Sequence, residues 1–202
     1  MKKLLRNSLY IGAAILGIGS LGAGGIVTKA ATTPPTPTTT SASATLTPGT
    51  ITISTAPGIT FGTVNSSADD ANYTSTGFSA PLEVADQGQA TGWSVSLADN
   101  GFTSSTTGGP TLTDAKLTVG SSTAAPTVSA TDKDNTSTPP TITSPLAVSS
   151  APATVFNASA GQGVGTFEAT YGPGDANLYV PAGDVGGSYS STLTWTLSNA
   201  PA

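Results

Sequence analysis

Residues 189–197, YSSTLTWTL, constrain the fold most, because they alternate strictly between two kinds of side chain. The odd-numbered positions are mostly large and apolar, whereas every even-numbered position is serine or threonine. A period of two residues places the apolar groups on one face of an extended chain and the hydroxyl groups on the other. The pattern is typical of a half-buried antiparallel strand. The segment 93–97, WSVSL, repeats it.

The composition of residues 49–202 also favours strands over helices, because Thr, Ser, Val and Gly dominate there and strong helix formers are scarce. We expect an all-β domain, an antiparallel two-sheet β-sandwich of roughly ten short strands. Residues 121–145 are poor in apolar groups and predict a long excursion or hairpin outside the sandwich. Apolar alternation favours strands at 50–55, 59–64, 82–86, 92–98, 115–119, 164–171, 176–180 and 188–198.

The N-terminal part of the chain has a different composition. A basic start, an uncharged and largely apolar run over 10–27 and small residues at 30–31 predict a secretory signal peptide over 1–30. The alternative is that this segment is retained as a membrane anchor, which would be the only contact with the membrane. Residues 31–48 are uncharged and rich in Pro, Thr and Ser, which predicts an extended linker before the domain at 49–202.

Composition excludes several classes of function. The chain has no His and no Cys, which removes a Ser-His-Asp triad, a cysteine nucleophile and a zinc finger. From residue 31 onwards two cations stand against eleven acidic residues, which leaves a net charge of −9. Such a surface repels nucleic acid, and we expect neither nucleic-acid binding nor a cofactor or metal.

Both tryptophans lie in the alternating segments, as Trp93 and Trp195. Burying a tryptophan side chain is strongly stabilising, so we expect both to lie in the core. On this reading Trp195→Ala would destabilise the domain by about 3–5 kcal/mol. The alternative is that one or both form a platform for a sugar ring or for an apolar group of a partner.

The C-terminal stretch YSSTLTWTLSNAP resembles the distal motif of the WxL domain, a surface module of Gram-positive bacteria. Six positions match the fixed positions of that motif: Tyr189, Leu193, Thr194, Trp195, Leu197 and Pro201. Upstream, the segment GWSVSLAD is similar to the proximal motif of the same family. Trp93 matches the tryptophan of that motif, Val95 stands where leucine is usual, and Leu97 follows two residues later. The resemblance covers roughly residues 45–202.

The resemblance implies a secreted, non-catalytic protein attached non-covalently to the cell wall, with peptidoglycan as the ligand. Only the motif positions carry over as candidate binding residues, and they could equally be structural. The alternative is a structural subunit that docks to another cell-surface protein, for example by strand addition at a sheet edge. For a sugar ligand, an exposed aromatic residue would supply the stacking surface, with five candidates: Tyr73, Phe78, Phe102, Tyr171 and Tyr179.

Two further features favour other chemistry only weakly. Asp132 and Asp134 begin like a calcium loop, but the Gly and Glu that an EF-hand requires are absent, so we expect a solvated loop. A remote alternative is a wall hydrolase that works with two carboxylates, because Glu168 lies in a Gly-rich strand. No pair of acidic residues shows a motif, so the sequence favours no enzyme.

Overall fold

The computed structural model describes residues 35–120 and 125–202. The described residues divide into two units, residues 35–43 and Ala44–Ala202. Residues 35–43 of the first unit have no helix or strand and are exposed. The signal peptide expected over 1–30 lies outside the described residues.

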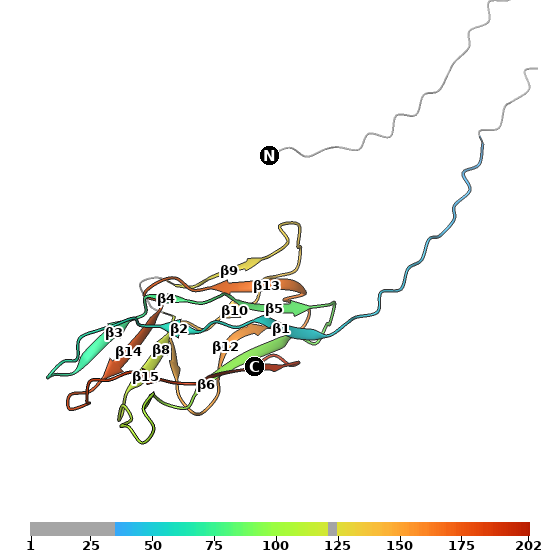
Figure 1. Ribbon diagram of the computed structural model, residues 1–202. Coiled ribbons are helices and arrows are strands. Elements are labelled where there is room, and N and C mark those ends of the chain that lie inside the picture. The colour runs from blue at the N-terminus through green and yellow to red at the C-terminus, as the bar shows by residue number, and fades with distance from the viewer. Residues whose placement is uncertain (1–34, 121–124) are drawn as a thin grey trace, which may run out of the picture. The chain divides into compact units, whose positions relative to one another are not determined.

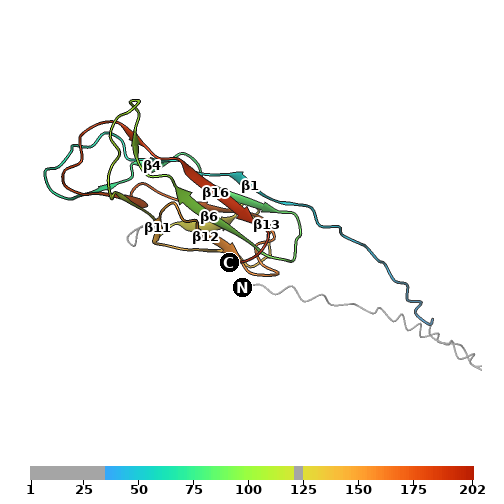
Figure 2. The same cartoon turned by 90° about the horizontal axis from the view of Figure 1, so that it is seen from below.

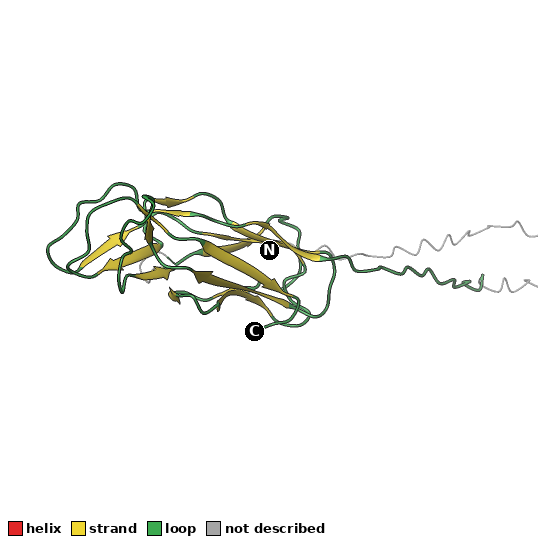
Figure 3. Cartoon of the chain, turned by 60° about the horizontal axis from the view of Figure 1, so that its bottom comes forward, coloured by secondary structure: helices red, strands yellow, loops and turns green. Residues whose placement is uncertain are grey.

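The described residues contain sixteen strands and no helix, and every strand pair is antiparallel. Figures 1 and 3 show the strands and the loops that join them. The first eight strands are β1 (Ile51–Thr55), β2 (Ile59–Thr60), β3 (Ala71–Thr74), β4 (Gly77–Phe78), β5 (Leu82–Asp86), β6 (Trp93–Asp99), β7 (Thr103–Ser104) and β8 (Lys116–Val119). The other eight are β9 (Thr127–Ala130), β10 (Thr141–Ile142), β11 (Leu146–Val148), β12 (Ala153–Ala158), β13 (Gly165–Thr170), β14 (Ala176–Val180), β15 (Tyr189–Ser190) and β16 (Leu193–Ser198).

Three four-stranded sheets form the body of the domain. The β5 sheet has the order β1-β5-β13-β9, the β6 sheet β10-β12-β6-β16, and the β8 sheet β11-β8-β14-β3. Two-stranded pairs, β15 with β7 and β2 with β4, complete the fold. In Figure 2 the neighbours β12, β6 and β16 are seen together, with β16 at the edge of its sheet.

The core forms because the strands alternate between apolar and polar residues. In β5, Leu82 and Val84 are fully buried, and Glu83 between them is half-buried. Strand β6 lies inside its sheet between β12 and β16 and is buried at most positions, as expected for a strand covered on both faces. The largest fully buried side chains are Trp93, Phe156, Phe167, Leu82 and Leu97.

The predicted all-β, antiparallel fold class is confirmed, whereas the described residues form sixteen strands in several sheets instead of roughly ten strands in two sheets. Five of the strands are only two residues long, so they carry no detectable alternation. The region 121–145 also differs, because it contributes β9 to the β5 sheet and β10 to the β6 sheet. Backbone pairing there does not depend on large apolar side chains, which the sequence reading required.

Candidate functional site

The three residues of the proximal motif form part of the core. Trp93, Val95 and Leu97 have no exposed surface. The Trp93 ring meets Phe156 edge to face with ring centroids 5.0 Å apart, and its Nε1 donates a hydrogen bond of 3.2 Å to the Gly163 carbonyl. A Cβ at Gly163 would lie 2.9 Å from that Nε1, so only glycine permits this approach. The described geometry gives this motif a packing role.

The distal motif lies on β16 directly beside the proximal one. Trp195 is the register partner of Leu97, and Leu197 is the partner of Val95. Thus the two motifs, about a hundred residues apart in sequence, occupy neighbouring strands of the β6 sheet. Their adjacency could not be read from the sequence, because strand order is not encoded in either motif.

Exposure separates the residues of the distal motif. Leu193, Trp195 and Leu197 are half-buried and pack against the core, whereas Thr194 is exposed. Pro201 is also exposed, and the chain beside it is held down by two hydrogen bonds. Ser94 Oγ donates to the Ala200 carbonyl at 2.8 Å, and the Ala202 N–H donates to Asn157 Oδ1 at 2.8 Å. The expectation of a core tryptophan therefore holds fully for Trp93 and only in part for Trp195.

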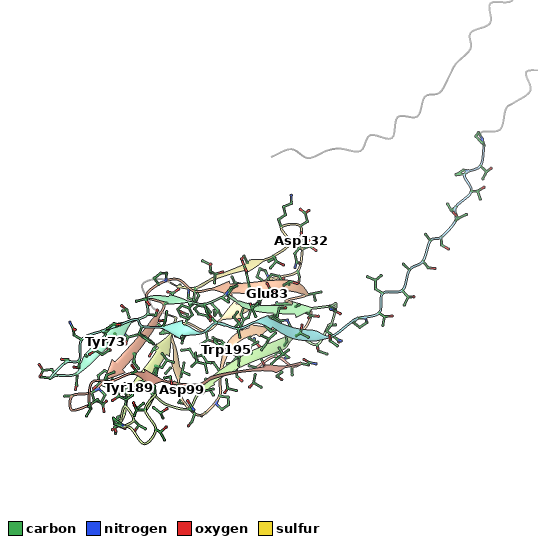
Figure 4. All side chains as sticks on the ribbon, in the orientation of Figure 1. Tyr73, Glu83, Asp99, Asp132, Tyr189 and Trp195 are labelled. Carbon is green, nitrogen blue, oxygen red and sulfur yellow. The ribbon has the colours of Figure 1, made fainter. Side chains whose placement is uncertain are left out.

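A groove of about 510 Å³ lies at the end of the domain formed by β2, β3, β14 and β15. Figure 4 places Tyr73 and Tyr189 at this end. The groove connects with the distal motif, because Tyr189 and Leu193 line it. Its other apolar and aromatic lining residues are Ile59, Phe61, Val64, Ala71, Phe102, Leu112, Leu117, Leu178, Val180, Pro181 and Val185. The sequence did not reveal it, because its residues come from six separate stretches of the chain.

Side chain to backbone hydrogen bonds fix the two loops that form the groove walls. Tyr73 Oη donates to the Asn65 carbonyl at 2.9 Å, and Tyr189 Oη donates to the Val185 carbonyl. Between the loops, Asp70 accepts hydrogen bonds of 2.9 Å from the Ala182 N–H and from Tyr179 Oη. These two bonds, led by that from Ala182, lower the pKa of Asp70, since they favour its charged form.

The groove is acidic. Asp69 and Asp184 line it, and no lysine or arginine does. Asp184 Oδ1 accepts a hydrogen bond of 3.2 Å from the Thr113 N–H, but its Oδ2 is buried with no hydrogen-bond partner. The two cations in the described part of the chain lie elsewhere, with Lys116 Nζ 5.7 Å from the centre of the Tyr179 ring and Lys133 in the loop after β9.

The five aromatic residues expected to be exposed divide into groups. Tyr73 and Phe102 line the groove. The half-buried Phe78 ring stacks on Tyr171 with the ring centroids 4.9 Å apart, and the expectation was wrong for Tyr171. Tyr171 is buried, and this burial raises its pKa. Tyr179 is half-buried between Asp70 and Lys116. The sequence alone does not show which of these aromatic rings is covered by another part of the chain.

The carboxylates considered for catalysis or for calcium lie away from the groove. Asp132 Oδ1 accepts a hydrogen bond of 2.9 Å from the Asp134 N–H, as in a self-contained turn. Among the residues described, no three His, Cys, Asp or Glu side chains come close enough together to hold a metal ion. Glu83 and Glu168 are direct register partners on β5 and β13, a pairing that the sequence did not reveal.

Together, the fold and the groove define an antiparallel β-sheet domain with an aromatic, acidic recess on its surface. Residues 25–201 match the family of the WxL domain, described as surface cell wall-binding. The match spans most of the chain, so the protein belongs to the WxL domain family. No curated protein and no solved structure matches it.

Family membership places the protein at the extracellular surface, in association with the cell wall. Within the described ranges, no helix is long and apolar enough to cross a membrane.

Proposed function

We propose that the protein attaches non-covalently to the cell wall by binding peptidoglycan, without catalysis, and that the groove is the contact surface. The observation that carries the proposal is the groove itself, where four aromatic side chains line one recess: Phe61, Tyr73, Phe102 and Tyr189. Apolar faces of sugar rings stack on aromatic rings, while hydroxyl and amide groups of the sugar form hydrogen bonds with polar wall residues. Membership of a wall-binding family supports the same function.

The motif residues take different parts in this proposal. Tyr189 and Leu193 contribute directly, because they line the groove. Trp93, Val95, Leu97, Trp195 and Leu197 act through the fold: they build the sheet whose edge strand leads into the groove. Thr194 and Pro201 are exposed outside it. The contact surface therefore overlaps the distal motif only at its N-terminal end.

The test is co-sedimentation with peptidoglycan stripped of teichoic acids and proteins. Val64 and Val185 are the most exposed apolar residues of the groove, 47% and 64% exposed, so Val64→Glu and Val185→Glu should alter binding without unfolding the domain. Thr194→Glu is the matched control, because Thr194 is exposed outside the groove. Saturable pelleting of the wild type and of the control, with loss in the groove variants, is expected. Equal pelleting of all four proteins would contradict the proposal.

A second candidate is docking to another cell-surface protein by strand addition to β16. This strand ends the order of the β6 sheet, so its second edge has no partner among the described strands. Its six residues pair with β6 in unbroken register, and none is a lysine or a proline, the residues that usually protect a free edge. An extended peptide can add to such an edge through backbone hydrogen bonds.

Strand addition and peptidoglycan binding predict different sensitivities. A double Thr194→Lys, Thr196→Lys variant would place two charges on β16, whereas Val185→Glu would change only the groove. A partner captured from cell-surface extracts by strand addition would be lost with the first variant and kept with the second. The reverse pattern would assign capture to the groove.

A further inference from the structure

We propose that the protein pairs with a second copy of itself through the free edge of β16, about a two-fold axis at Trp195. The observation behind the proposal is the palindrome formed by residues 193–197, Leu-Thr-Trp-Thr-Leu, which reads the same in both directions. The inference goes beyond peptidoglycan binding and does not depend on it, because β16 meets the groove only at Leu193. It assigns the edge of β16 to a second copy of the chain in place of a different surface protein.

The outer edge of β16 is regular and unpaired. Among the described residues, the backbone of β16 pairs with β6 alone, in unbroken register over all six residues of the strand. Successive residues of an antiparallel strand direct their N–H and C=O groups to opposite sides, so every second residue of β16 directs these groups away from β6. Figure 2 shows β16 at the margin of its sheet. Its outer edge is therefore a template for one further strand.

The other five edge strands of the three large sheets carry features that oppose pairing. Strand β1 pairs with β5 in an irregular register. In β3, β9, β10 and β11, the residue directly before the strand is an aspartate or a proline: Asp70, Pro126, Pro140 and Pro145. Proline, charged residues and bulges are the features with which natural proteins protect sheet edges. Strand β16 has none of them, so it is the edge best suited to pairing.

Antiparallel pairing about Trp195 matches each side chain of the palindrome with one of its own kind. Residues directly opposite each other in an antiparallel pair lie on the same face of the sheet. Leu193 of one copy would therefore face Leu197 of the other, and the two Trp195 side chains would face each other. Thr194 would face Thr196 on the exposed side. Aromatic pairs and threonine pairs across strands are stabilising, and a contact of this symmetry closes as a dimer.

Charge also favours this edge over the rest of the surface. From residue 31 onwards the chain carries a net charge of −9, so two copies repel each other in most orientations. Residues 185–202 contain no charged side chain, and they include all of β16 and the segments on either side of it. Two copies that approach along this edge therefore place no charged side chains of these segments opposite each other.

The experiment is sedimentation velocity on the chain from residue 31 onwards, which holds the whole unit Ala44–Ala202, between about 1 and about 100 μM. The double variant Thr194→Lys, Thr196→Lys would place lysine opposite lysine in both threonine pairs. The matched control, Thr194→Lys, Thr196→Glu, would place lysine opposite glutamate in both pairs, and it does so only in the register about Trp195. Both positions are exposed, so the variants should fold, which thermal melting establishes.

The wild type is expected to form a reversible dimer in this range of concentration. The two lysines should raise the Kd of the dimer by at least about tenfold, although they lower the overall negative charge, and the lysine with glutamate should restore the dimer. A wild type that stays monomeric, or a dimer that persists unchanged with the two lysines, would overturn the proposal. Loss of the dimer in both double variants would overturn the pairing about Trp195.

Discussion

The burial of the two tryptophans leads to a quantitative expectation for Trp93→Ala and Trp195→Ala. The Trp93 side chain is fully buried, so truncation to alanine removes roughly 150 Å² of apolar surface from the area buried on folding. At about 25 cal/mol per Å², this loss lowers the free energy of unfolding by about 4 kcal/mol. Loss of the hydrogen bond from Nε1 to the Gly163 carbonyl adds about 1 kcal/mol. We therefore expect Trp93→Ala to lower the free energy of unfolding by about 5 kcal/mol.

Trp195→Ala should cost less, because Trp195 is half-buried on an edge strand. Half of the same apolar surface corresponds to about 2 kcal/mol, below the range of about 3–5 kcal/mol expected if this residue were fully buried. The two variants should therefore differ by about 3 kcal/mol in their free energy of unfolding. This difference is better determined than either value, since errors in the surface area assigned to the unfolded chain partly cancel.

Urea unfolding followed by circular dichroism measures both free energies on the chain from residue 31 onwards. If Trp93→Ala fails to fold, Trp93→Phe provides a milder step that still deletes the Nε1 hydrogen bond. Each single variant retains one tryptophan, whose fluorescence reports the same transition. An equal or larger loss for Trp195→Ala would refute the assignment of Trp93 to the core and Trp195 to its margin.

Three further expectations follow from single contacts. Glu83→Gln should raise the free energy of unfolding at pH 7 by about 0.2–1 kcal/mol, because it removes repulsion from Glu168 directly across the strands; no gain in a urea titration would contradict this. The pKa of Tyr171 is raised in the folded protein, so its contribution to stability is present below its ordinary pKa of 10 and is lost as the pH rises above that value. Tyr171→Phe has no phenol to ionise, so it should unfold less readily in alkali than the wild type. The pKa of Asp70 is lowered in the folded protein, so its contribution to stability is present above its ordinary pKa of 3.8 and is lost as the pH falls through the lower value of the folded state. In acid, the melting temperature of Asp70→Asn should therefore depend less on pH than that of the wild type.

Local alternation revealed the class of the fold but not the arrangement of its strands. The pattern in 189–197 correctly placed Leu193, Trp195 and Leu197 on the inner face of a strand, because that signal needs only the chain's own period of two. The single strand expected over 188–198 is divided, however, since Tyr189–Ser190 form β15 and pair with β7. The pattern did not reveal that β16 lies at a sheet edge, where the same face is only half-buried. Edge or interior position depends on which strands pair, and this is settled by contacts distant in sequence.

The candidate site shows the same division. Tyr189 and Leu193 were singled out as motif positions, and they do line the groove. Phe61 and Val185 also line the groove but were not singled out in the sequence, because they become neighbours only through contacts distant along the chain. Tyr171 shows the converse, since its burial beneath Phe78 excludes it as a ligand contact.

The central claim is that the groove binds peptidoglycan, and it is tested most directly by the affinity of Val185→Glu relative to Thr194→Glu for stripped peptidoglycan. Both changes add one negative charge at an exposed position, but only Val185 lines the groove. The account predicts saturable binding by Thr194→Glu with wild-type affinity and a loss of about tenfold or more for Val185→Glu. Equal affinity of the two variants, or stronger binding by Val185→Glu, would contradict it.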